Sequence, residues 1–327
     1  MKILVTGGSG LLGTSLIPQL IKSGHQVFAL VRSASALEKV WDLGAQPIEG
    51  DLDDDTPLML PKLDAVVHAA AMFRFSGSIQ PFYRTNVDGT AKILAAAECA
   101  GIAHFVHISA AGVIMDESGS PIRCADESTP TYSRHFSAYL ASKAQAEKLV
   151  LQANKPVFRT IILRPTALWG PGDQFSSGIL HAIRSRKFVF IDRGDYIFST
   201  CHVENLVEAV QCALRYPKGG RVFFIADQKV QTFREFVASI ASTNDLPLEH
   251  FFSIPYWLAS ATGRFMDVAW TILRRNDDPP LSRSLVRMIG REFCISDIAA
   301  RQELGYVGKA SQDPRDRGLL HYRCVHS

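Results

Sequence analysis

The chain has 327 residues, 47% of them hydrophobic and 20% charged, which is enough to bury the core of one large α/β unit. Its 35 basic and 32 acidic residues leave a net charge of +3, too small and too evenly spread to predict nucleic-acid binding. No secretory signal is visible, and the apolar stretch at 251–273 is interrupted by a proline and charges. The six cysteines are scattered without a C-x-x-C pair, so we expect thiols, a cytoplasmic location and no membrane-spanning segment.

The first two-thirds of the chain alternate short apolar runs with longer amphipathic segments. We predict strands at 2–6, 27–31, 65–68, 105–109, 160–164 and 222–226, and helices at 11–23, 87–100 and 137–153. This alternation is typical of an α/β fold with a doubly wound parallel sheet. From about residue 227 helical segments dominate and predict a smaller, mainly helical C-terminal lobe. We therefore expect a dinucleotide-binding domain at 1–166 and 200–226 and a substrate-binding lobe at 167–199 and 227–327.

A glycine-rich turn follows the first strand and opens the first helix. Glycines at 7, 10 and 13 let the chain turn tightly and let a pyrophosphate approach the backbone at the helix N-terminus. The position between a strand and a helix favours the cofactor-binding turn of a Rossmann-type sheet over an ordinary loop. The residues expected to bind the cofactor here are Thr6, Gly7, Gly10, Leu11, Leu12 and Gly13.

The end of the second strand indicates which nicotinamide cofactor binds. An enzyme that prefers NAD usually carries an acid there, about 20 residues past the turn, for the ribose 2′-hydroxyl. This chain has Arg32 and Ser33, and its next acid is Glu38. A guanidinium pairs well with a 2′-phosphate, so we predict NADP, with NAD as the alternative if Arg32 is only a surface cation.

Tyr139 and Lys143 lie four residues apart in a predicted helix, hence on one face. A neighbouring ammonium favours phenolate, so we expect the pKa of Tyr139 to fall towards a range useful for proton transfer. The Y-x-x-x-K spacing also arises by chance, but its combination with the early glycine turn and the strand that ends near Ser109 indicates a proton relay.

These segments, in this order, resemble an extended short-chain dehydrogenase/reductase of the NAD(P)-dependent epimerase/dehydratase superfamily, over most of the chain. The resemblance gives Asn86, in the segment Thr85-Asn86-Val87-Asp88-Gly89-Thr90, a structural and catalytic supporting role. It also implies three further cofactor-binding segments: Asp51 and Leu52 contact the adenine, the backbone of Ala69, Ala70 and Ala71 lines the cofactor, and Pro165 and Thr166 lie by the nicotinamide. Tyr139 and Lys143 complete the implied cofactor-binding set.

The fifth strand departs from the family pattern. The family usually ends this strand with two or three Ser/Thr residues, the later one bonding the substrate oxygen. Here the strand ends in Ser109, and Ala110 takes the usual hydroxyl position. Either Ser109 acts after a small backbone shift, or Tyr139 and Lys143 form the relay alone. The predicted catalytic set is Tyr139, Lys143, Ser109 and Asn86.

Further positions distinguish the branches of the family. Dehydratases of the family carry an Asp-Glu pair just after the strand hydroxyl, and this chain has Ala110 and Ala111 there instead. Phe198 stands where sugar-nucleotide enzymes often carry an arginine. Residues 201–207 and the tail at 279–306 resemble the 3β-hydroxysteroid dehydrogenase-like and dihydroflavonol-reductase-like branch. Aromatic residues of the lobe favour a hydrophobic ketone, although each alone would suit core packing. They are Phe251, Phe252, Tyr256, Trp257, Phe265 and Trp270, with Phe73 and Phe75 as either pocket wall or surface cap.

We therefore predict an NAD(P)H-dependent oxidoreductase that reduces a ketone or aldehyde, or oxidises the alcohol, on a bulky, largely apolar substrate, with Tyr139 as general acid/base. A sugar-nucleotide epimerase with tightly bound NAD is one alternative. A catalytically weak, cofactor-binding regulatory protein is another, favoured by Ala110. No histidine pair has metal-ligand spacing, so no metal is predicted. The resemblance also implies a homodimer through helices such as 87–100 and 137–153.

Overall fold

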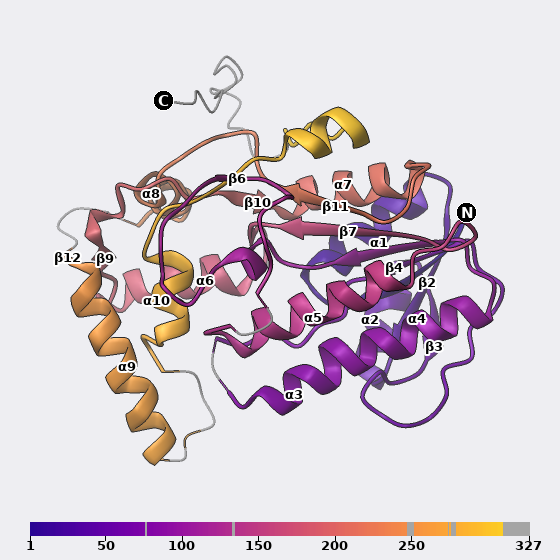
Figure 1. Cartoon of the computed structure of the whole chain (residues 1–327), viewed down its shortest axis with the longest axis horizontal. Helices are drawn as coiled ribbons and strands as arrows, with labels where there is room; N and C mark the ends of the chain where they lie inside the picture. Colours follow the sequence, from indigo (N-terminus) through magenta and orange to yellow (C-terminus); the bar gives the residue numbers. More distant parts are fainter. Residues whose placement is uncertain (76, 133–134, 247–251, 274, 276–278, 310–327) are drawn as a thin grey trace.

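The structure is a computed structural model that describes residues 1–75, 77–132, 135–246, 252–273, 275 and 279–309. Its centre is a sheet of seven parallel strands in the spatial order β11-β7-β5-β4-β1-β2-β3 (Figure 1). The chain runs outward from β1 to β3 and then crosses back to β4, so the strand order reverses beside β1, where such sheets bind dinucleotides. The strands are β1 (Lys2–Thr6), β2 (Gln26–Val31), β3 (Gln46–Glu49), β4 (Ala65–His68), β5 (His104–Ile108), β7 (Arg159–Pro165) and β11 (Arg221–Ile225).

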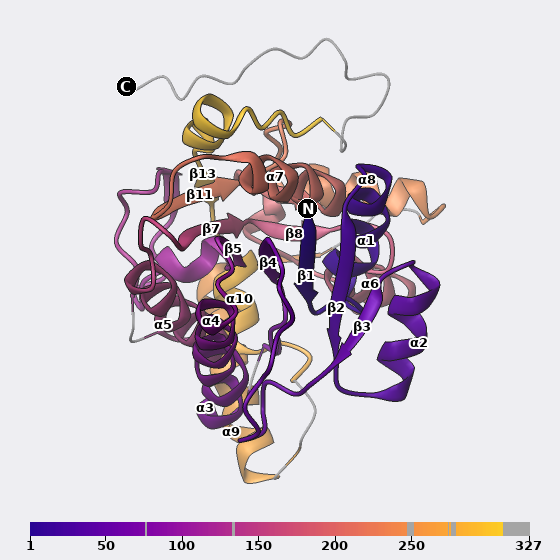
Figure 2. The ribbon, with the colours of Figure 1, turned by 90° about the vertical axis from the view of Figure 1, so that its right-hand side faces the viewer.

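Helices cover both faces of this sheet, which is why its strands are apolar on both sides (Figure 2). In β1, Ile3 and Val5 pack into one layer and Leu4 packs into the other, as the two-residue repeat of a strand requires. One layer contains α1 (Leu11–Lys22), α2 (Ala34–Asp42) and α7 (Val203–Arg215), and the other contains α3 (Ile79–Tyr83), α4 (Gly89–Cys99) and α5 (Ala138–Gln152). The predicted Rossmann-type α/β fold is confirmed.

The predicted strands, and the helices at 11–23 and 137–153, agree with the structure to within one residue at each end. The helix predicted at 87–100 begins two residues later, because Arg84–Asp88 forms a separate π-helical turn that contains Asn86. Strand β5 ends at Ile108, so Ser109 is the first residue beyond it, where the chain turns over the carboxyl edge of the sheet.

The lobe over this edge contains α6 (Gln174–Arg184), α8 (Phe233–Thr243), α9 (Tyr256–Ile272) and α10 (Arg283–Ile289), at the left of Figure 1. Its core is aromatic, because large rings from several short segments meet there. Phe190, Phe198, Phe233, Phe236 and Phe293 are all almost completely buried in this cluster.

The lobe is less exclusively helical than predicted. Three two-stranded parallel sheets join segments far apart in the chain: β8 (Ala167–Trp169) with β10 (Thr200–His202), β9 (Phe190–Ile191) with β12 (Ser253–Ile254), and β6 (Ile122–Ala125) with β13 (Phe293–Ile295). Strands of two to four residues are too short to show an alternating pattern, so the sequence did not reveal them. The division of the chain into two domains stays a prediction, although β6 extends from the predicted dinucleotide domain to pair with the lobe.

Within the described residues, no helix combines the length and the hydropathy needed to cross a membrane. Cys201, Cys212 and Cys294 are buried free thiols and Cys99 is an exposed one, in line with the expectation for scattered cysteines.

Candidate active site

The glycine turn is packed so closely that side chains would not fit. Gly7 has φ +72°, and a Cβ on it would lie 2.9 Å from the backbone nitrogen of Ala70. A Cβ on Gly13 would lie only 2.4 Å from the carbonyl oxygen of Gly8. Helix α1 begins at Leu11, and its N-cap residue Gly10 supplies no side-chain cap, so the N–H groups of its first turn lie at the cavity without a capping side chain. This bare cradle at a helix N-terminus fits the pyrophosphate of a dinucleotide.

A chain of buried hydrogen bonds connects this turn to the second helical layer. The Thr90 hydroxyl donates to the backbone oxygen of Asn86 at 2.6 Å, so it accepts from the ring Nε2 of His68 at 3.0 Å. The other ring nitrogen, Nδ1, then accepts from the Thr6 hydroxyl at 2.7 Å, and Thr6 accepts from the N–H of Ala70 at 3.1 Å. Burial lowers the pKa of His68 to about 3, so this ring is neutral, as the directions of the bonds require.

Asn86 continues this network towards helix α5. Its carboxamide oxygen accepts from the N–H of Met72 at 2.7 Å, and its amide donates to the carbonyl of Met72 at 3.1 Å and to the Ser142 hydroxyl at 2.9 Å. Ser142 in turn donates to the carbonyl of Tyr139 at 2.7 Å. Asn86 therefore fixes the segment after β4 against α5 and acts as a positioning residue, since it does not line the cavity described next.

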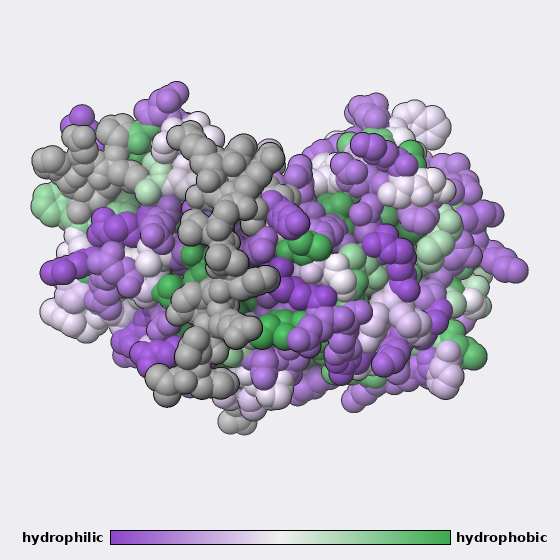
Figure 3. All heavy atoms as spheres, turned by 90° about the horizontal axis from the view of Figure 1, so that it is seen from above, coloured by the Kyte–Doolittle hydropathy of each residue, from purple (hydrophilic) through white to green (hydrophobic). Residues whose placement is uncertain are grey.

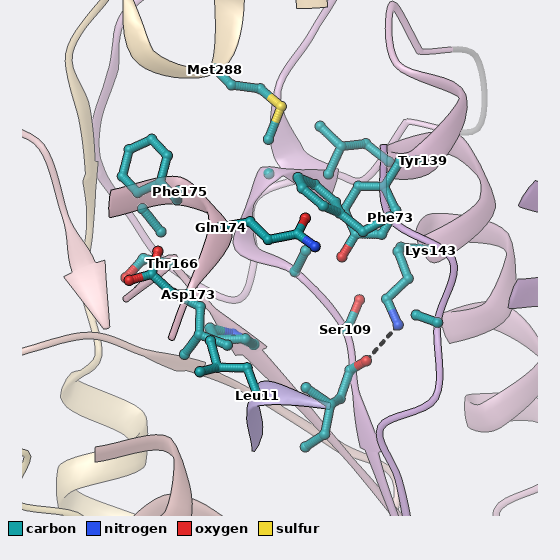
Figure 4. Close-up of a pocket in the computed structure, with 18 of the residues that line it drawn as sticks. Leu11, Phe73, Ser109, Tyr139, Lys143, Thr166, Asp173, Gln174, Phe175 and Met288 are labelled. Atoms are coloured by element: carbon teal, nitrogen blue, oxygen red, sulfur yellow. Dashed lines mark hydrogen bonds between the residues drawn. The ribbon is translucent and has the colours of Figure 1, made fainter. Parts of the chain in front are cut away.

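A cavity of about 490 Å³ lies between the carboxyl edge of the sheet and the lobe (Figure 4). The predicted residues that line it are Gly10, Leu11, Leu12, Ala69, Ala71, Ser109, Tyr139, Lys143, Pro165 and Thr166. The other predicted residues do not line it, namely Thr6, Gly7, Gly13, Ala70, Arg32, Asp51, Leu52 and Asn86. The cavity therefore combines one end of a dinucleotide site with a separate space bounded by the lobe.

Tyr139 and Lys143 project from α5 towards this cavity. The Phe73 ring packs edge-on against Tyr139, with ring centroids 4.8 Å apart. The ammonium of Lys143 donates to the carbonyl of Ile108 at 2.5 Å. Burial lowers the pKa of Lys143 to about 8, an effect that the Glu147 carboxylate opposes. The expected lowering of the Tyr139 pKa is not found: burial raises it, because loss of water around the phenolate outweighs the attraction of an ammonium that is turned to Ile108.

Ser109 supplies a hydroxyl on the same wall. Its side chain is 3% exposed, lines the cavity, and has no hydrogen-bond partner among the residues that the structure describes. In Figure 4 this hydroxyl lies beside Lys143 and below the Tyr139 hydroxyl, directed into the cavity. A buried hydroxyl without a partner costs free energy, so its orientation favours a role towards a bound molecule. Ala110 also lines the cavity but has only a methyl group to offer.

The rest of the wall is mainly apolar. Phe73, Phe75, Met115, Phe175, Phe198, Met288, Ile289 and Phe293 line it. Phe73 and Phe75 are thus wall residues rather than a surface cap. Phe198, which is 2% exposed, fills the position where an arginine would grip a sugar diphosphate. The aromatic residues of the lobe that favoured an apolar pocket are elsewhere: Phe251 lies outside the described residues, and the other five do not line the cavity.

Sequence reasoning missed two polar residues, Gln174 at the cavity and Lys39 at the glycine turn. Gln174 opens helix α6 and extends its carboxamide into the cavity towards the Tyr139 hydroxyl (Figure 4). The neighbouring Asp173 is committed to the fold, because its carboxylate caps α6 by accepting from the N–H of Ser176 at 2.6 Å. At the adenosine end, the Lys39 ammonium donates to the carbonyl of Ser9 at 2.8 Å. The loop position of Gln174 after the Gly170-Pro171-Gly172 segment was the available signal for it.

Arg32, the residue that favours NADP, is partly engaged in the protein itself. Its guanidinium lies 2.8 Å from the Asp53 carboxylate and 3.7 Å from that of Asp51. Its side chain is 62% exposed, so this pairing is weak and can rearrange around a phosphate. Lys39 thus lies against the glycine turn, and Arg32 directly follows β2, the strand beside β1.

The sheet order, the bare glycine turn and the tyrosine–lysine pair define an NAD(P)-dependent oxidoreductase of the short-chain type, acting on CH–OH and C=O groups. The chain belongs to the 3-beta hydroxysteroid dehydrogenase/isomerase family, whose model matches residues 4–256. This membership confirms the predicted superfamily, branch and enzyme class.

Two relatives cover nearly the whole chain. It is 40% identical over 314 residues to the 4-hydroxy-2-methyl-3-oxo-4-farnesyl-3,4-dihydroquinoline-1-oxide ketoreductase of Stigmatella aurantiaca, covering 95% of this chain and 93% of the relative. It is 31% identical over 326 residues to the 2-alkyl-3-oxoalkanoate reductase of Stenotrophomonas maltophilia (strain K279a), covering 95% and 96%. A solved structure, MoeE5 in complex with UDP-glucuronic acid and NAD, matches with a TM-score of 0.71 at 22% identity over 95% of each chain. That likeness concerns the fold alone.

Proposed function

We propose that this enzyme is an NADP(H)-dependent reductase of a ketone on a bulky, largely apolar substrate, with Tyr139 as the proton donor. The observation that carries the proposal is the meeting of Ser109, Tyr139 and Lys143 on one wall of a cavity whose other walls are mainly apolar. The names of both relatives support it, since one reduces a 3-oxo compound with a farnesyl group and the other a 2-alkyl-3-oxoalkanoate.

The proposed mechanism assigns a separate task to each side chain. The nicotinamide, held by the glycine turn, Ala69 to Ala71, Pro165 and Thr166, supplies the hydride when bound. Tyr139 donates its proton to the carbonyl oxygen, and its raised pKa keeps the phenol protonated until the transfer. The Ser109 hydroxyl donates a second hydrogen bond to the same oxygen. Lys143 stabilises the phenolate that remains.

The lobe side of the cavity has two tasks in this proposal. Phe73, packed on the Tyr139 ring, excludes water from the phenol and so strengthens each polar contact around it. The carboxamide of Gln174 offers a neutral polar contact to the substrate opposite the relay. An apolar substrate with few polar groups suits this distribution.

NADP(H) is the proposed cofactor because two cations, Arg32 and Lys39, flank the adenosine end. Asp53 competes with the 2′-phosphate for Arg32, so we expect a preference of moderate size rather than exclusion of NAD(H). A cytoplasmic location, where NADPH is available, and a homodimer through α4 and α5 complete the proposal.

One observation favours a second candidate, a regulatory protein that binds the cofactor with little turnover. Ala110 removes the hydroxyl from the position that the family usually uses. The orientation of Ser109 into the cavity weighs against this candidate. Phe198 weighs against the epimerase, because a buried phenyl ring offers nothing to a diphosphate.

The test measures NADPH and NADH oxidation by the purified protein with ketones that range from short-chain 2-alkanones to 2-alkyl-3-oxoalkanoates and steroid-like ketones. We expect turnover with NADPH on the larger apolar ketones and a loss of at least about a hundredfold in Tyr139→Phe. Tyr83→Phe, on α3 and away from the cavity, is the matched control. Tight NADPH binding without turnover on any ketone would favour the regulatory candidate, and interconversion of sugar-nucleotide epimers without net oxidation would favour the epimerase.

A further inference from the structure

Helix α9 is built the opposite way from an ordinary surface helix. Of its 17 residues only Ala259 and Gly263 are buried. Several of its large apolar side chains point to solvent instead: Trp257 is 69% exposed, Phe265 74%, Val268 58% and Ile272 74%. A surface helix normally turns its apolar stripe to the core and its charged residues to water.

Contacts with α10 fix this orientation. A Cβ on Gly263 would lie 3.0 Å from the backbone nitrogen of Arg283, so only glycine allows the two segments to approach this closely. On the same side of α9, the Asp267 carboxylate accepts a hydrogen bond from the N–H of Arg283 at 3.0 Å. The small residues and the carboxylate therefore face the lobe together with the half-buried Tyr256, Met266 and Trp270, and the remaining large apolar residues face outward.

The outward residues form one continuous row. Trp257, Ala261, Phe265, Val268 and Ile272 are spaced by four, four, three and four residues, which places them on a single face of an α-helix. We name this row the α9 stripe. It is roughly 22 Å long at the usual rise per residue of a helix. Leu258 and Leu273, both exposed, lie beside it and widen it.

The position of α9 makes this stripe accessible. The helix projects at the lower left of Figure 1, away from the sheet, and again at the bottom of Figure 2. The face shown in Figure 3 is different: most of its coloured surface is polar, with hydrophobic residues in small separate groups. An apolar row of this length on a protruding helix marks a surface that another partner covers.

We propose that the α9 stripe binds the surface of a phospholipid membrane that contains anionic lipids, with the helix lying in the plane of the interface. The charges fit this partner. Arg264 is the only exposed charged residue of α9, whereas Asp267 is turned towards Arg283. Tryptophan and arginine next to an apolar face are typical of interfacial helices, and cations are attracted by anionic headgroups.

A second copy of this chain fits the stripe less well. A two-fold interface over the stripe would bury Arg264 of both copies in one apolar contact, and no exposed carboxylate of α9 is available to pair with them. At a membrane, each Arg264 side chain can instead reach the headgroups while the stripe enters the acyl layer.

Membrane binding would place the catalytic cavity next to a store of apolar molecules. Helix α10, on which α9 packs, contributes Met288 and Ile289 to the wall of the cavity. A substrate dissolved in the lipid would then reach the lobe side of the cavity from the interface. The binding of lipid by α9 does not depend on which reaction the cavity carries out.

The test is flotation of the full-length protein, loaded with NADPH, with vesicles of phosphatidylcholine containing phosphatidylglycerol. We expect the wild type to float and the double variant Phe265→Ser/Ile272→Ser to remain in solution. Each lost apolar side chain should weaken partitioning by about ten- to a hundredfold. Arg264→Gln should weaken it about fivefold on anionic vesicles and leave binding to pure phosphatidylcholine unchanged. The matched control is Trp41→Ser/Met59→Ser, which removes two other exposed apolar side chains, 64% and 84% exposed, and should float as the wild type does.

Circular dichroism and NADPH binding check that the variants are folded, since the α9 stripe touches neither the core nor the cavity. Wild-type protein that stays in solution, or a double variant that floats like the wild type, would overturn the proposal. Light scattering gives a third decisive outcome: a lipid-free dimer that dissociates in the double variant would assign the stripe to a second copy and also overturn it.

Discussion

Replacing Ser109 by alanine should lower the rate of ketone reduction while it raises the stability of the fold. The loss of one hydrogen-bond donor to a developing oxyanion typically reduces kcat by about 10²–10³. In the free protein the same hydroxyl is 3% exposed and has no partner among the described residues. An unpaired buried hydroxyl costs about 1–3 kcal/mol, and its removal should return part of this.

The assay combines two measurements on Ser109→Ala. Steady-state oxidation of NADPH with the best ketone of the panel gives kcat and KM, and we expect the loss mainly in kcat because the hydrogen bond strengthens in the transition state. Thermal unfolding of the cofactor-free protein should show a Tm higher by about 1–3 °C for a chain of this size. Opposite signs of the two effects distinguish a catalytic hydroxyl from a structural one.

A companion variant tests the alternative that the hydroxyl belongs at position 110. If Ser109 acts, Ala110→Ser should change kcat little, and Ser109→Ala/Ala110→Ser should remain slow. Unchanged turnover in Ser109→Ala would refute the reasoning and leave Tyr139 and Lys143 as the whole relay. Recovery of activity in the double variant would show that the usual position suffices and that the orientation of Ser109 has no catalytic meaning.

Three further outcomes follow from charges in and around the site. Arg32→Ala should lower kcat/KM for NADPH about tenfold and leave kcat/KM for NADH unchanged. Asp53→Ala should increase the preference for NADPH, because it frees the guanidinium of Arg32. The ratio of kcat/KM for the two cofactors measures both effects. Burial lowers the pKa of Lys143 to about 8, so its ammonium is present below pH 8 and lost above it. The rate of reduction should therefore decline by about tenfold per pH unit above pH 8. A pH–rate profile that stays flat to pH 10 would contradict this. Glu147→Leu should reduce the free energy of unfolding by about 3–5 kcal/mol, because it leaves the guanidinium of Arg164, only 5% exposed, without its bidentate partner. Urea titration measures this loss. The double variant Glu147→Leu/Arg164→Met should recover most of it.

The fold was predictable because most strands of the central sheet are apolar on both faces and are separated by helices of clear periodicity. The glycine turn and the spacing of Tyr139 and Lys143 were visible for a similar reason, since each depends on residues close together in the chain. The short sheets of the lobe were not visible, because β6 and β13 are about 170 residues apart and only three or four residues long. Nothing local in either segment indicates its partner.

Many of the residues that line the cavity were predictable, whereas the electrostatics of Tyr139 were not. The prediction of a lowered pKa for Tyr139 considered only the neighbouring Lys143. The folded chain adds burial beneath Phe73 and turns the ammonium to the carbonyl of Ile108, and both effects act against the phenolate. The aromatic residues of α9 were likewise assigned to an apolar pocket, whereas Trp257 and Phe265 face solvent. Composition shows that apolar side chains are abundant, but the direction they face depends on the contacts of Gly263 and Asp267.

The free protein holds its reactive groups at a cost in free energy, and the surrounding contacts explain how the fold tolerates this. Burial lowers the pKa of Lys143 and raises that of Tyr139, so the charged form of each group is disfavoured before any substrate arrives. Helix α5, which carries both, is held to β7 by the buried pair of Glu147 with Arg164 and to the segment after β4 by Asn86. The contacts of Glu147, Arg164 and Asn86 do not involve the hydroxyl of Tyr139 or that of Ser109. They can therefore hold α5 in one position while both hydroxyl groups remain free to bond a substrate. A carbonyl oxygen that enters the cavity therefore meets donors that need little reorganisation, which is the condition under which electrostatic stabilisation of a transition state is greatest.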